Sequence, residues 1–273
     1  MKAIKLFFQG LLVLGIFLTL VNLYGLTQNI RVDNFDNEYL RFPNDQPLPF
    51  EKSVTEVIKK ANETDLEYAK RVTQVISQGV SHVSWLKFPA DQFNQLIPIW
   101  ENYFLYFMGK FSGIPEFERY HFANYERSLK RGIGICGDAS MILSQLLDKQ
   151  NIRNQILTFP GHVVVVAHFK NDDEYILDAD FGVVIPYSVD EMVKNVDDTA
   201  KLYLDAGYKS WDFVFFQNAY RQEFASWNGV KHFITKKYYF EKIVYWLKWP
   251  LPFIMIVFSL WIIRKNATKE STI

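Results

Sequence analysis

The chain has 273 residues, enough for one domain with a sizeable core once two apolar terminal segments are set aside. Lysine plus arginine and aspartate plus glutamate number 30 each, so no basic field exists that would neutralise nucleic-acid phosphates. Nucleic acid is therefore excluded as an expected partner. Aromatic residues make up 17% of the chain, and we expect some of them to lie at a membrane interface.

The first predicted element is a membrane span over residues 6–26. These residues carry no charge and follow Lys2 and Lys5, and the run is long enough to cross the hydrocarbon core of a bilayer. A cleaved signal peptide is the rival interpretation. However, the apolar run is longer than a typical signal-peptide core, and no A-x-A-like cleavage motif follows it. We therefore predict a short tail at residues 1–5 and an uncleaved anchor at residues 6–26.

Residues 27–60 are predicted to be a connector, because their prolines break any long element. The domain itself is predicted to cover residues 61–242. Near its start, Thr64-Asp65-Leu66-Glu67 forms a capping-box pattern, and apolar residues follow at helical spacing to about Gly79. A helix is predicted there. The stretch 93–125 is rich in aromatic residues without a clear period, which is more typical of core or cleft lining than of sugar stacking.

The segment that starts at Gly132 reads GIGICGD and contains the single cysteine of the chain, Cys136. Apolar residues follow at the i, i+3, i+4, i+7 spacing of an amphipathic helix, so Cys136 is predicted at a helix N-terminus. Unpaired N–H groups and the helix dipole favour a thiolate there. A lone cysteine is otherwise a small buried apolar residue, and this one has no partner for an internal disulfide. The apolar positions are Ala139, Ile142, Leu143, Leu146 and Leu147.

Three strand-like runs, residues 155–159, 163–169 and 174–177, follow this helix. Residues 170–173 make a turn between the last two, so an antiparallel hairpin is predicted. Folding about this turn brings His162, at the start of one strand, beside Asp178 and Asp180, at the end of the next. A turn register can be read from sequence only to within a residue or two, so both acids remain candidates.

An imidazole beside Cys136 would hold the thiol proton, and a carboxylate would fix the orientation of that imidazole. His162 is the candidate because an acid is predicted beside it. His168 has the same strand parity, but it lies six residues further along, about 20 Å away. The remaining histidines lack a comparable partner pattern and are interpreted as structural: His82, His121 and His232.

These residues resemble the transglutaminase-like, papain-related superfamily of cysteine enzymes, over roughly residues 126–186. The resemblance implies a Cys136-His162-Asp178 triad and an α+β fold in which the nucleophile helix packs on an antiparallel sheet. Two departures indicate a divergent branch: Ala179 stands where a proline often follows the acid, and Val164 stands where an aromatic residue is often seen. The matching blocks are GICGDA at 134–139, GHVVVV at 161–166 and YILDADFG at 175–182.

The second terminal segment, residues 243–263, is also predicted to span a membrane. Lys248 interrupts it and two prolines follow, but Trp246 and Trp249 suit an interfacial belt, and Lys248 near the end can extend to the surface. An interfacial helix is the rival interpretation. If both segments span, Lys2 and Lys5 put the N-terminus and the tail at residues 264–273 in the cytoplasm, and the domain outside.

The resemblance implies a hydrolase or acyl transferase that acts on amide or peptide bonds through a thioester. Membrane-anchored bacterial members of similar layout imply, by analogy, an envelope or surface-polysaccharide role at the inner (cytoplasmic) membrane. Expected partners are the lipid bilayer and a peptide, protein or glycan-linked amide. No metal and no cofactor are predicted, because no cluster shows ligand spacing. The alternative is a catalytically inactive envelope binding or scaffold protein that keeps the fold.

Overall fold

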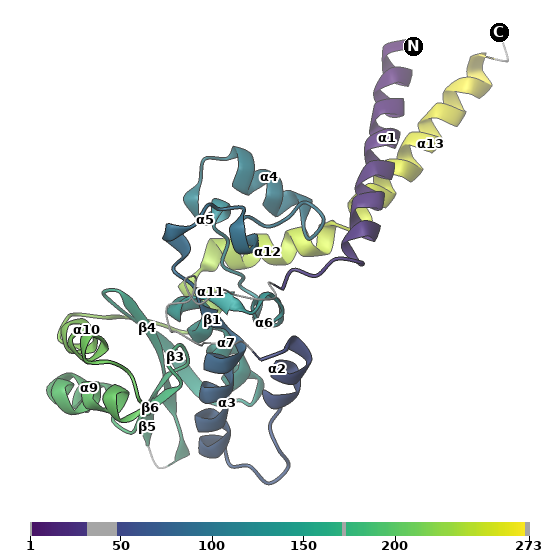
Figure 1. The fold of residues 1–273 in the computed structure, drawn as a ribbon. Coiled ribbons are helices and arrows are strands. Elements are labelled where there is room, and N and C mark those ends of the chain that lie inside the picture. The colour runs from purple at the N-terminus through teal and green to yellow at the C-terminus, as the bar shows by residue number, and fades with distance from the viewer. Residues whose placement is uncertain (1, 32–47, 171–172, 271–273) are drawn as a thin grey trace. The chain divides into compact units, whose positions relative to one another are not determined.

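The computed structural model describes residues 2–31, 48–170 and 173–270. Within them the fold is α+β, with one antiparallel sheet of five strands and a two-stranded parallel pair. The chain divides into two compact units, each built from separate segments of the chain. Figure 1 colours the elements by their position in the sequence. Unit 1 combines residues 1–30, 90–120 and 239–273, and unit 2 combines residues 31–89 and 121–238.

Unit 2 contains the sheet and the helices that cover it. Its elements, in chain order, are α2 (Phe50–Glu56), α3 (Asp65–Gly79), β1 (Ser81–His82), η1 (Trp85–Lys87), α6 (Tyr125–Arg131), β2 (Ile133–Gly134), α7 (Cys136–Lys149), β3 (Arg153–Phe159), β4 (His162–His168), β5 (Glu174–Asp178), β6 (Val183–Ile185), α8 (Val189–Lys194), α9 (Val196–Asp205), α10 (Ser210–Tyr220), β7 (Ala225–Trp227) and α11 (Val230–Phe233).

The large sheet has the strand order β6-β5-β4-β3-β7, and each neighbouring pair is antiparallel. β3 and β4 form a tight hairpin in which Phe159 pairs with His162, so that only Pro160 and Gly161 lie between the strands. Gly161 has φ +81°, a conformation that suits glycine. The turn therefore makes His162 the first residue of β4.

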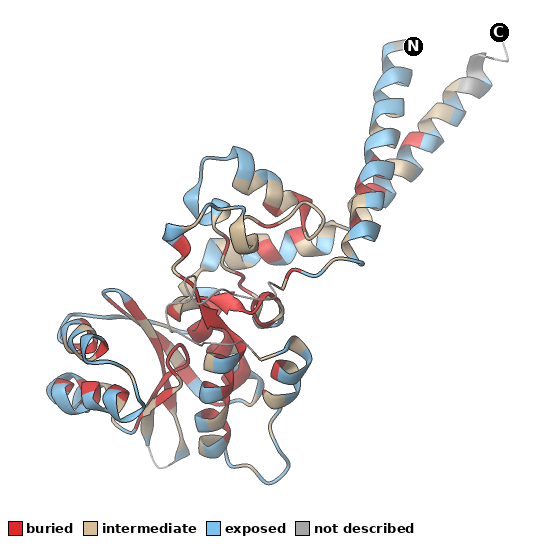
Figure 2. Ribbon diagram, viewed as in Figure 1, coloured by how far each residue is buried: buried red, intermediate tan, exposed pale blue. Residues whose placement is uncertain are grey.

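Two apolar clusters lie on opposite faces of this sheet. Val165 and Leu177 belong to the cluster that includes apolar residues of α3 and α7, whereas Val164 and Ile176 belong to the cluster that includes α9 and α10. The alternation of neighbouring strand residues between the two clusters follows from the two-residue period of a strand. Figure 2 shows the buried residues gathered on the strands and on parts of the helices beside them.

The two helices that the sequence predicts within the domain are confirmed as α3 and α7. Thr64 caps α3, because its hydroxyl accepts from Glu67 N–H while the Glu67 carboxylate accepts from Thr64 N–H. The amphipathic pattern after Cys136 is α7, whose apolar residues are buried. The three predicted strands are also confirmed as β3, β4 and β5. The other elements of unit 2, β6, β7, α9 and α10 among them, were not predicted.

Unit 1 contains α1 (Lys2–Gly25), within which Ala3–Gly25 is long and apolar enough to cross a membrane, with a mean hydropathy of 2.2. Gly15 lets α1 approach α13 closely, since a Cβ there would lie 3.0 Å from the Pro252 carbonyl oxygen. The other elements of this unit are η2 (Gln92–Asn94), α4 (Tyr103–Phe111), α5 (Pro115–Glu118), most of α12 (Thr235–Leu247) and α13 (Pro250–Glu270).

The predicted second span, residues 243–263, is divided between two helices. α12 ends at Leu247, α13 begins at Pro250, and the pair bends by 46°. Only the two helices taken together are long and apolar enough to span a membrane. The predicted connector at residues 27–60 holds α2, while residues 32–47 within it lie outside the described residues, as do residues 171–172 of the predicted hairpin turn.

Candidate active site

Cys136 is the first residue of α7 and keeps 9% of its surface exposed. Two contacts define the start of this helix. The parallel pairing of β1 with β2 holds the residues just before it, with His82 opposite Gly134. The backbone N–H of Ile135 donates to Asp138 Oδ2 at 3.0 Å, which satisfies one donor at the helix start. The sulfur therefore lies at a rigid helix N-terminus.

A side-chain contact joins α7 to the strand that carries the histidine. Ser140 Oγ donates a 2.9 Å hydrogen bond to the carbonyl oxygen of Val163. Ser140 lies one turn after Cys136, and Val163 directly follows His162. The bond thus fixes the first turn of the helix against the first residues of β4, and brings Cys136 and His162 together.

His162 is 1% exposed, and its two ring nitrogens have different surroundings. Nε2 donates a 2.7 Å hydrogen bond to Asp178 Oδ2. Nδ1 is buried and makes no hydrogen bond to any described residue. The Cys136 sulfur nevertheless lies close, because Sγ, a ring nitrogen of His162 and a carboxylate oxygen of Asp180 all fall within 4.8 Å of one another. Nδ1 is the nitrogen left to exchange a proton with the sulfur.

Four aromatic rings pack around the His162 ring. Ring centroids lie 5.2 Å from Phe216, 5.7 Å from Phe181, 6.0 Å from Phe215 and 6.3 Å from Tyr220, all near edge-on. Three of these rings come from α10, which follows the sheet in the chain. The imidazole is consequently held in one orientation by packing as well as by its hydrogen bond to Asp178.

Asp178 is fully buried and accepts four hydrogen bonds. Its Oδ2 accepts from His162 Nε2 and from the Tyr203 hydroxyl, both at 2.7 Å. Its Oδ1 accepts from the backbone N–H groups of Asp180 and Phe181, at 3.0 and 3.1 Å. A carboxylate with all its acceptor sites used by donors is stabilised as an anion despite burial.

The partner of His162 is Asp178 rather than Asp180, although both acids were candidates from the sequence. In the β4–β5 register Val165 pairs with Leu177, so continuing the same register would put His162 opposite Asp180. Asp178 lies two residues from that position and points to the same face, within the diagonal reach of a cross-strand pair. The choice therefore depends on side-chain direction, which a register alone does not determine.

The charges around His162 favour its protonated form. Burial alone would lower the pKa of His162, but the neighbouring Asp178 carboxylate, with a smaller contribution from Cys136, raises it to about 10. Burial also raises the pKa of Tyr203 and Tyr220 well above the ordinary value. Both phenols thus remain protonated, and Tyr203 stays a donor to Asp178. The arrangement can hold an imidazolium next to the sulfur.

Asp180 and His82 form a second buried pair at the same site. His82 Nδ1 lies 2.7 and 2.8 Å from the two Asp180 oxygens, and each residue is 7% exposed. No sequence pattern indicated this pair, because His82 reaches it through a strand of two residues far from Asp180 in the chain. Tyr203 was missed for a similar reason, since no motif marks α9.

The other histidines have partners elsewhere in unit 2. His121 Nδ1 donates to Asp138 Oδ2 at 2.7 Å, at the start of α7. His168 lies 3.1 Å from Glu174, at the end of β4 opposite to His162. His232 contacts the Trp227 ring at the edge of the sheet.

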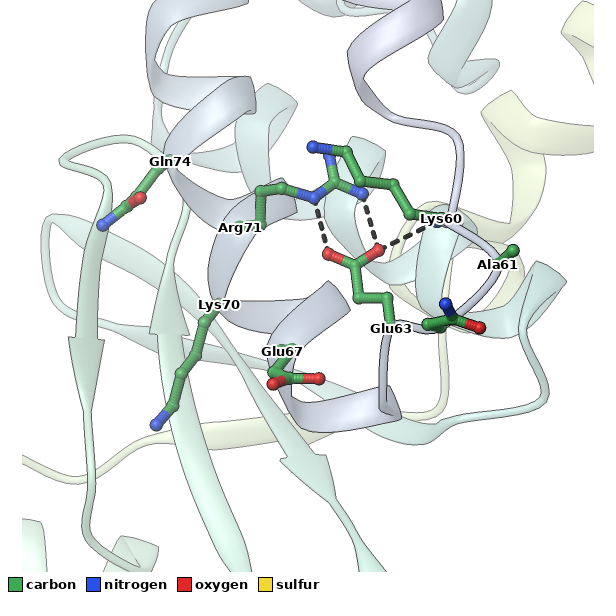
Figure 3. A pocket seen from close by; sticks show the side chains of 8 residues that line it. Lys60, Ala61, Glu63, Glu67, Lys70, Arg71 and Gln74 are labelled. Carbon is green, nitrogen blue, oxygen red and sulfur yellow. Dashed lines mark hydrogen bonds and ion pairs between the residues drawn. The ribbon is translucent and has the colours of Figure 1, made fainter.

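A surface hollow of about 680 Å³ lies beside α3 (Figure 3), but its main charged group is engaged by the protein itself. Arg71 donates to both oxygens of Glu63, at 2.6 and 2.8 Å, and to two backbone carbonyls. The hydrogen bond from Arg71 lowers the pKa of Glu63 to about 2. These contacts stabilise the loop before α3, and we interpret the hollow as a consequence of how this loop folds.

Comparison with known proteins finds no matching family model, no matching curated protein and no matching solved structure. The chemistry of the residues around Cys136 is therefore what remains to indicate a function.

Proposed function

We propose that this protein is a membrane-anchored cysteine enzyme that cleaves or transfers an acyl group from an amide or ester. Cys136 is the nucleophile, His162 exchanges the proton, and Asp178 orients His162 and balances its charge. The observation that carries the proposal is the buried His162 ring, bonded through Nε2 to Asp178 and with Nδ1 left near the sulfur of the only cysteine in the chain.

In the first step the Cys136 thiolate attacks the substrate carbonyl carbon and forms a tetrahedral oxyanion. As the bond from that carbon to the leaving group breaks, His162 gives its Nδ1 proton to the leaving amine or alcohol. A thioester on Cys136 and a neutral His162 result. Asp178 keeps the Nε2–H fixed throughout, so the ring presents the same nitrogen to each reacting group.

In the second step an acceptor attacks the thioester. Water or an amine loses a proton to His162 Nδ1 as it bonds to the carbonyl carbon, and the sulfur leaves as thiolate. Water makes the reaction a hydrolysis, and an amine makes it a transfer. The enzyme returns to its imidazolium–thiolate state without a net change in protons on the protein.

The start of α7 offers stabilisation for the oxyanion. N–H groups in the first turn of a helix have no intrahelical partner, and the helix dipole favours negative charge there. Gly137 adds space, because a Cβ at this position would meet no atom within 4 Å. An acyl group on Cys136 therefore has room on the Gly137 side.

The same proposal includes a fold and a location. The nucleophile helix α7 against the antiparallel strands β3 and β4 supports a transglutaminase-like core. The apolar α1 supports an anchor, and the bent α12–α13 pair supports a second, broken span. We place the domain outside the inner membrane of a bacterium, where it would act on an envelope peptide, protein or glycan-linked amide.

Alkylation of the full chain with iodoacetamide tests the thiolate directly, because Cys136 is the one cysteine that can react. At pH 6 we expect labelling of the folded protein to be at least about tenfold faster than labelling of the same chain in denaturant. Intact mass measures the rate, and Cys136→Ser provides the blank.

Turnover of an activated acetyl ester then tests acyl transfer. A transient acetyl adduct on wild-type protein, absent from Cys136→Ser of equal thermal stability, is the expected result. Labelling of the folded chain slower than that of the unfolded chain, with no adduct, would leave the inactive scaffold as the better explanation.

A further inference from the structure

Asp180 belongs to the site around Cys136, but the proposed reaction gives it no task. Its carboxylate oxygen, the Cys136 sulfur and a His162 ring nitrogen lie within 4.8 Å of one another, and all three residues are buried. A thiolate with a second carboxylate so close to it needs a positive charge between them. The His162 imidazolium supplies one such charge, and a cation bound by all three atoms would supply another.

The donor set selects the kind of cation. A thiolate, an imidazole and a carboxylate are ligands typical of Zn²⁺, which takes four ligands in a tetrahedron. Mg²⁺ and Ca²⁺ prefer oxygen ligands throughout, so a sulfur and a nitrogen among three ligands disfavour them. The three protein ligands leave a fourth position open to water.

His162 and Asp180 are each oriented by a hydrogen bond to another buried side chain, as metal ligands in proteins usually are. His162 donates its Nε2–H to Asp178, which leaves Nδ1 buried without a hydrogen bond to the described residues and directed to the site. The Asp180 carboxylate is held by His82 Nδ1. A carboxylate behind a ligating histidine, and a donor behind a ligating carboxylate, are the usual supports of protein-bound zinc.

We propose that Zn²⁺ binds Cys136, His162 and Asp180 and reversibly switches off the thiol. Binding uses the sulfur lone pair and Nδ1, and the Nδ1 proton passes to solvent. Neither atom is then available to a substrate. The inference rests on the proposed function, because it concerns regulation of the same nucleophile. It differs from the sequence prediction of no metal site, since the ligands come from α7, β4 and the loop after β5.

The test is the protection of Cys136 from iodoacetamide in the detergent-solubilised full chain. Alkylation is followed with increasing Zn²⁺, with Mg²⁺ as the comparison ion, and EDTA is then added. We expect Zn²⁺ to slow alkylation at least about tenfold, Mg²⁺ to have no effect, and EDTA to restore the original rate.

Asp180→Asn and Glu174→Gln form the matched pair of variants. In Asp180→Asn the side-chain amide oxygen can still accept from His82 but carries no charge, and we expect the Zn²⁺ concentration that gives half protection to rise at least about tenfold. Glu174 faces His168 at the far end of β4, so Glu174→Gln should match wild type. Each variant is compared with its own rate without metal.

Two results would overturn the inference. Rapid alkylation that Zn²⁺ does not slow would reject the metal site and leave the proposed enzyme intact. Equal protection of wild type and Asp180→Asn would reject Asp180 as a ligand.

Slow alkylation in the absence of metal would instead contradict the proposed function. Co²⁺ then tests the site separately, because a thiolate-to-Co²⁺ charge-transfer band does not require a reactive thiol. A band in wild type that is lost in Asp180→Asn would retain the metal site, and its absence from wild type would reject it.

Discussion

The pairs His162–Asp178 and His121–Asp138 both lie near the start of α7, but the first is fully buried whereas His121 is partly exposed, and the two aspartates have different further partners. His162–Asp178 and His121–Asp138 have the same 2.7 Å contact. Asp138 also accepts from the backbone N–H of Ile135, so this pair secures the helix start. Asp178 instead accepts from Nε2 of His162 and from three other donors. The other ring nitrogen, Nδ1, has no hydrogen bond to a described residue, and the Cys136 sulfur lies close to the ring. The same two residue types thus hold a helix start in one place, and in the other place leave a ring nitrogen free to exchange a proton.

The largest expected effect is the difference between two variants, one in which His162 and one in which His121 is replaced with glutamine. For His162→Gln we expect alkylation at pH 6 to fall about 100-fold, because an ordinary thiol titrates near 8.5 and is mostly protonated there. For His121→Gln we expect a rate within about twofold of wild type, since glutamine can still donate to Asp138. Thermal unfolding of both variants verifies that they fold. Equal rates for the two variants would remove the distinction between the pairs.

The pH profile of the same experiment sharpens this comparison. His162, with its pKa raised to about 10, should keep the wild-type alkylation rate nearly flat from about pH 6 to 9, while His162→Gln rises steadily. The raised pKa also stabilises the folded state. That contribution is complete below the unfolded pKa of about 6.5 and is lost as the pH rises through about 10. A parallel rise in both proteins would contradict the ion pair.

A smaller effect, on stability at acid pH, should come from Asp138. Burial would raise its pKa, but His121, then Arg131 and the Ile135 N–H, together lower it below the ordinary value. Its stabilisation is therefore present above about pH 4 and is lost as the pH falls through the lowered pKa. We expect Asp138→Asn to cost about 2 kcal/mol at pH 7 and to flatten the acid side of the stability curve. Denaturant unfolding at several pH values measures both.

The smallest expected effect separates two tyrosines behind Asp178. The Tyr203 hydroxyl donates to Asp178 and lies 2.6 Å from the Tyr220 hydroxyl. Tyr203→Phe removes a donor to a buried anion and should cost about 1.5 kcal/mol, whereas Tyr220→Phe should cost about 0.5 to 1 kcal/mol. Urea unfolding measures the difference. Equal costs would mean that the bond to Asp178 contributes little to stability.

The sequence predicted those parts of the site that depend on local pattern. The helical spacing after Cys136 predicted α7, and the three strand-like runs predicted β3 to β5, so the approach of His162 to an acid followed from a hairpin. The catalytic roles of Cys136, His162 and Asp178 stay predictions that alkylation and turnover will decide. Local pattern was sufficient because each element is short and its neighbours lie nearby in the chain.

The remaining features depend on contacts between distant segments. His82 reaches Asp180 through a parallel pairing of two residues, too short for a periodic signal. Tyr203 and the rings of α10 reach the site only because those helices cover the second face of the sheet. The sequence pattern predicts one continuous span over residues 243–263. The structure breaks it between α12 and α13, because Pro250 begins a new helix.

The hydroxyl of Tyr203 has a consequence for dissecting the protein. The motif resemblance ends near Pro186, and every member of the suggested triad precedes that point. A fragment cut there would retain the three side chains yet expose the apolar face of β4 and lose a donor to Asp178. A fragment that keeps every contact of the His162–Asp178 pair must therefore extend through α10, to Tyr220.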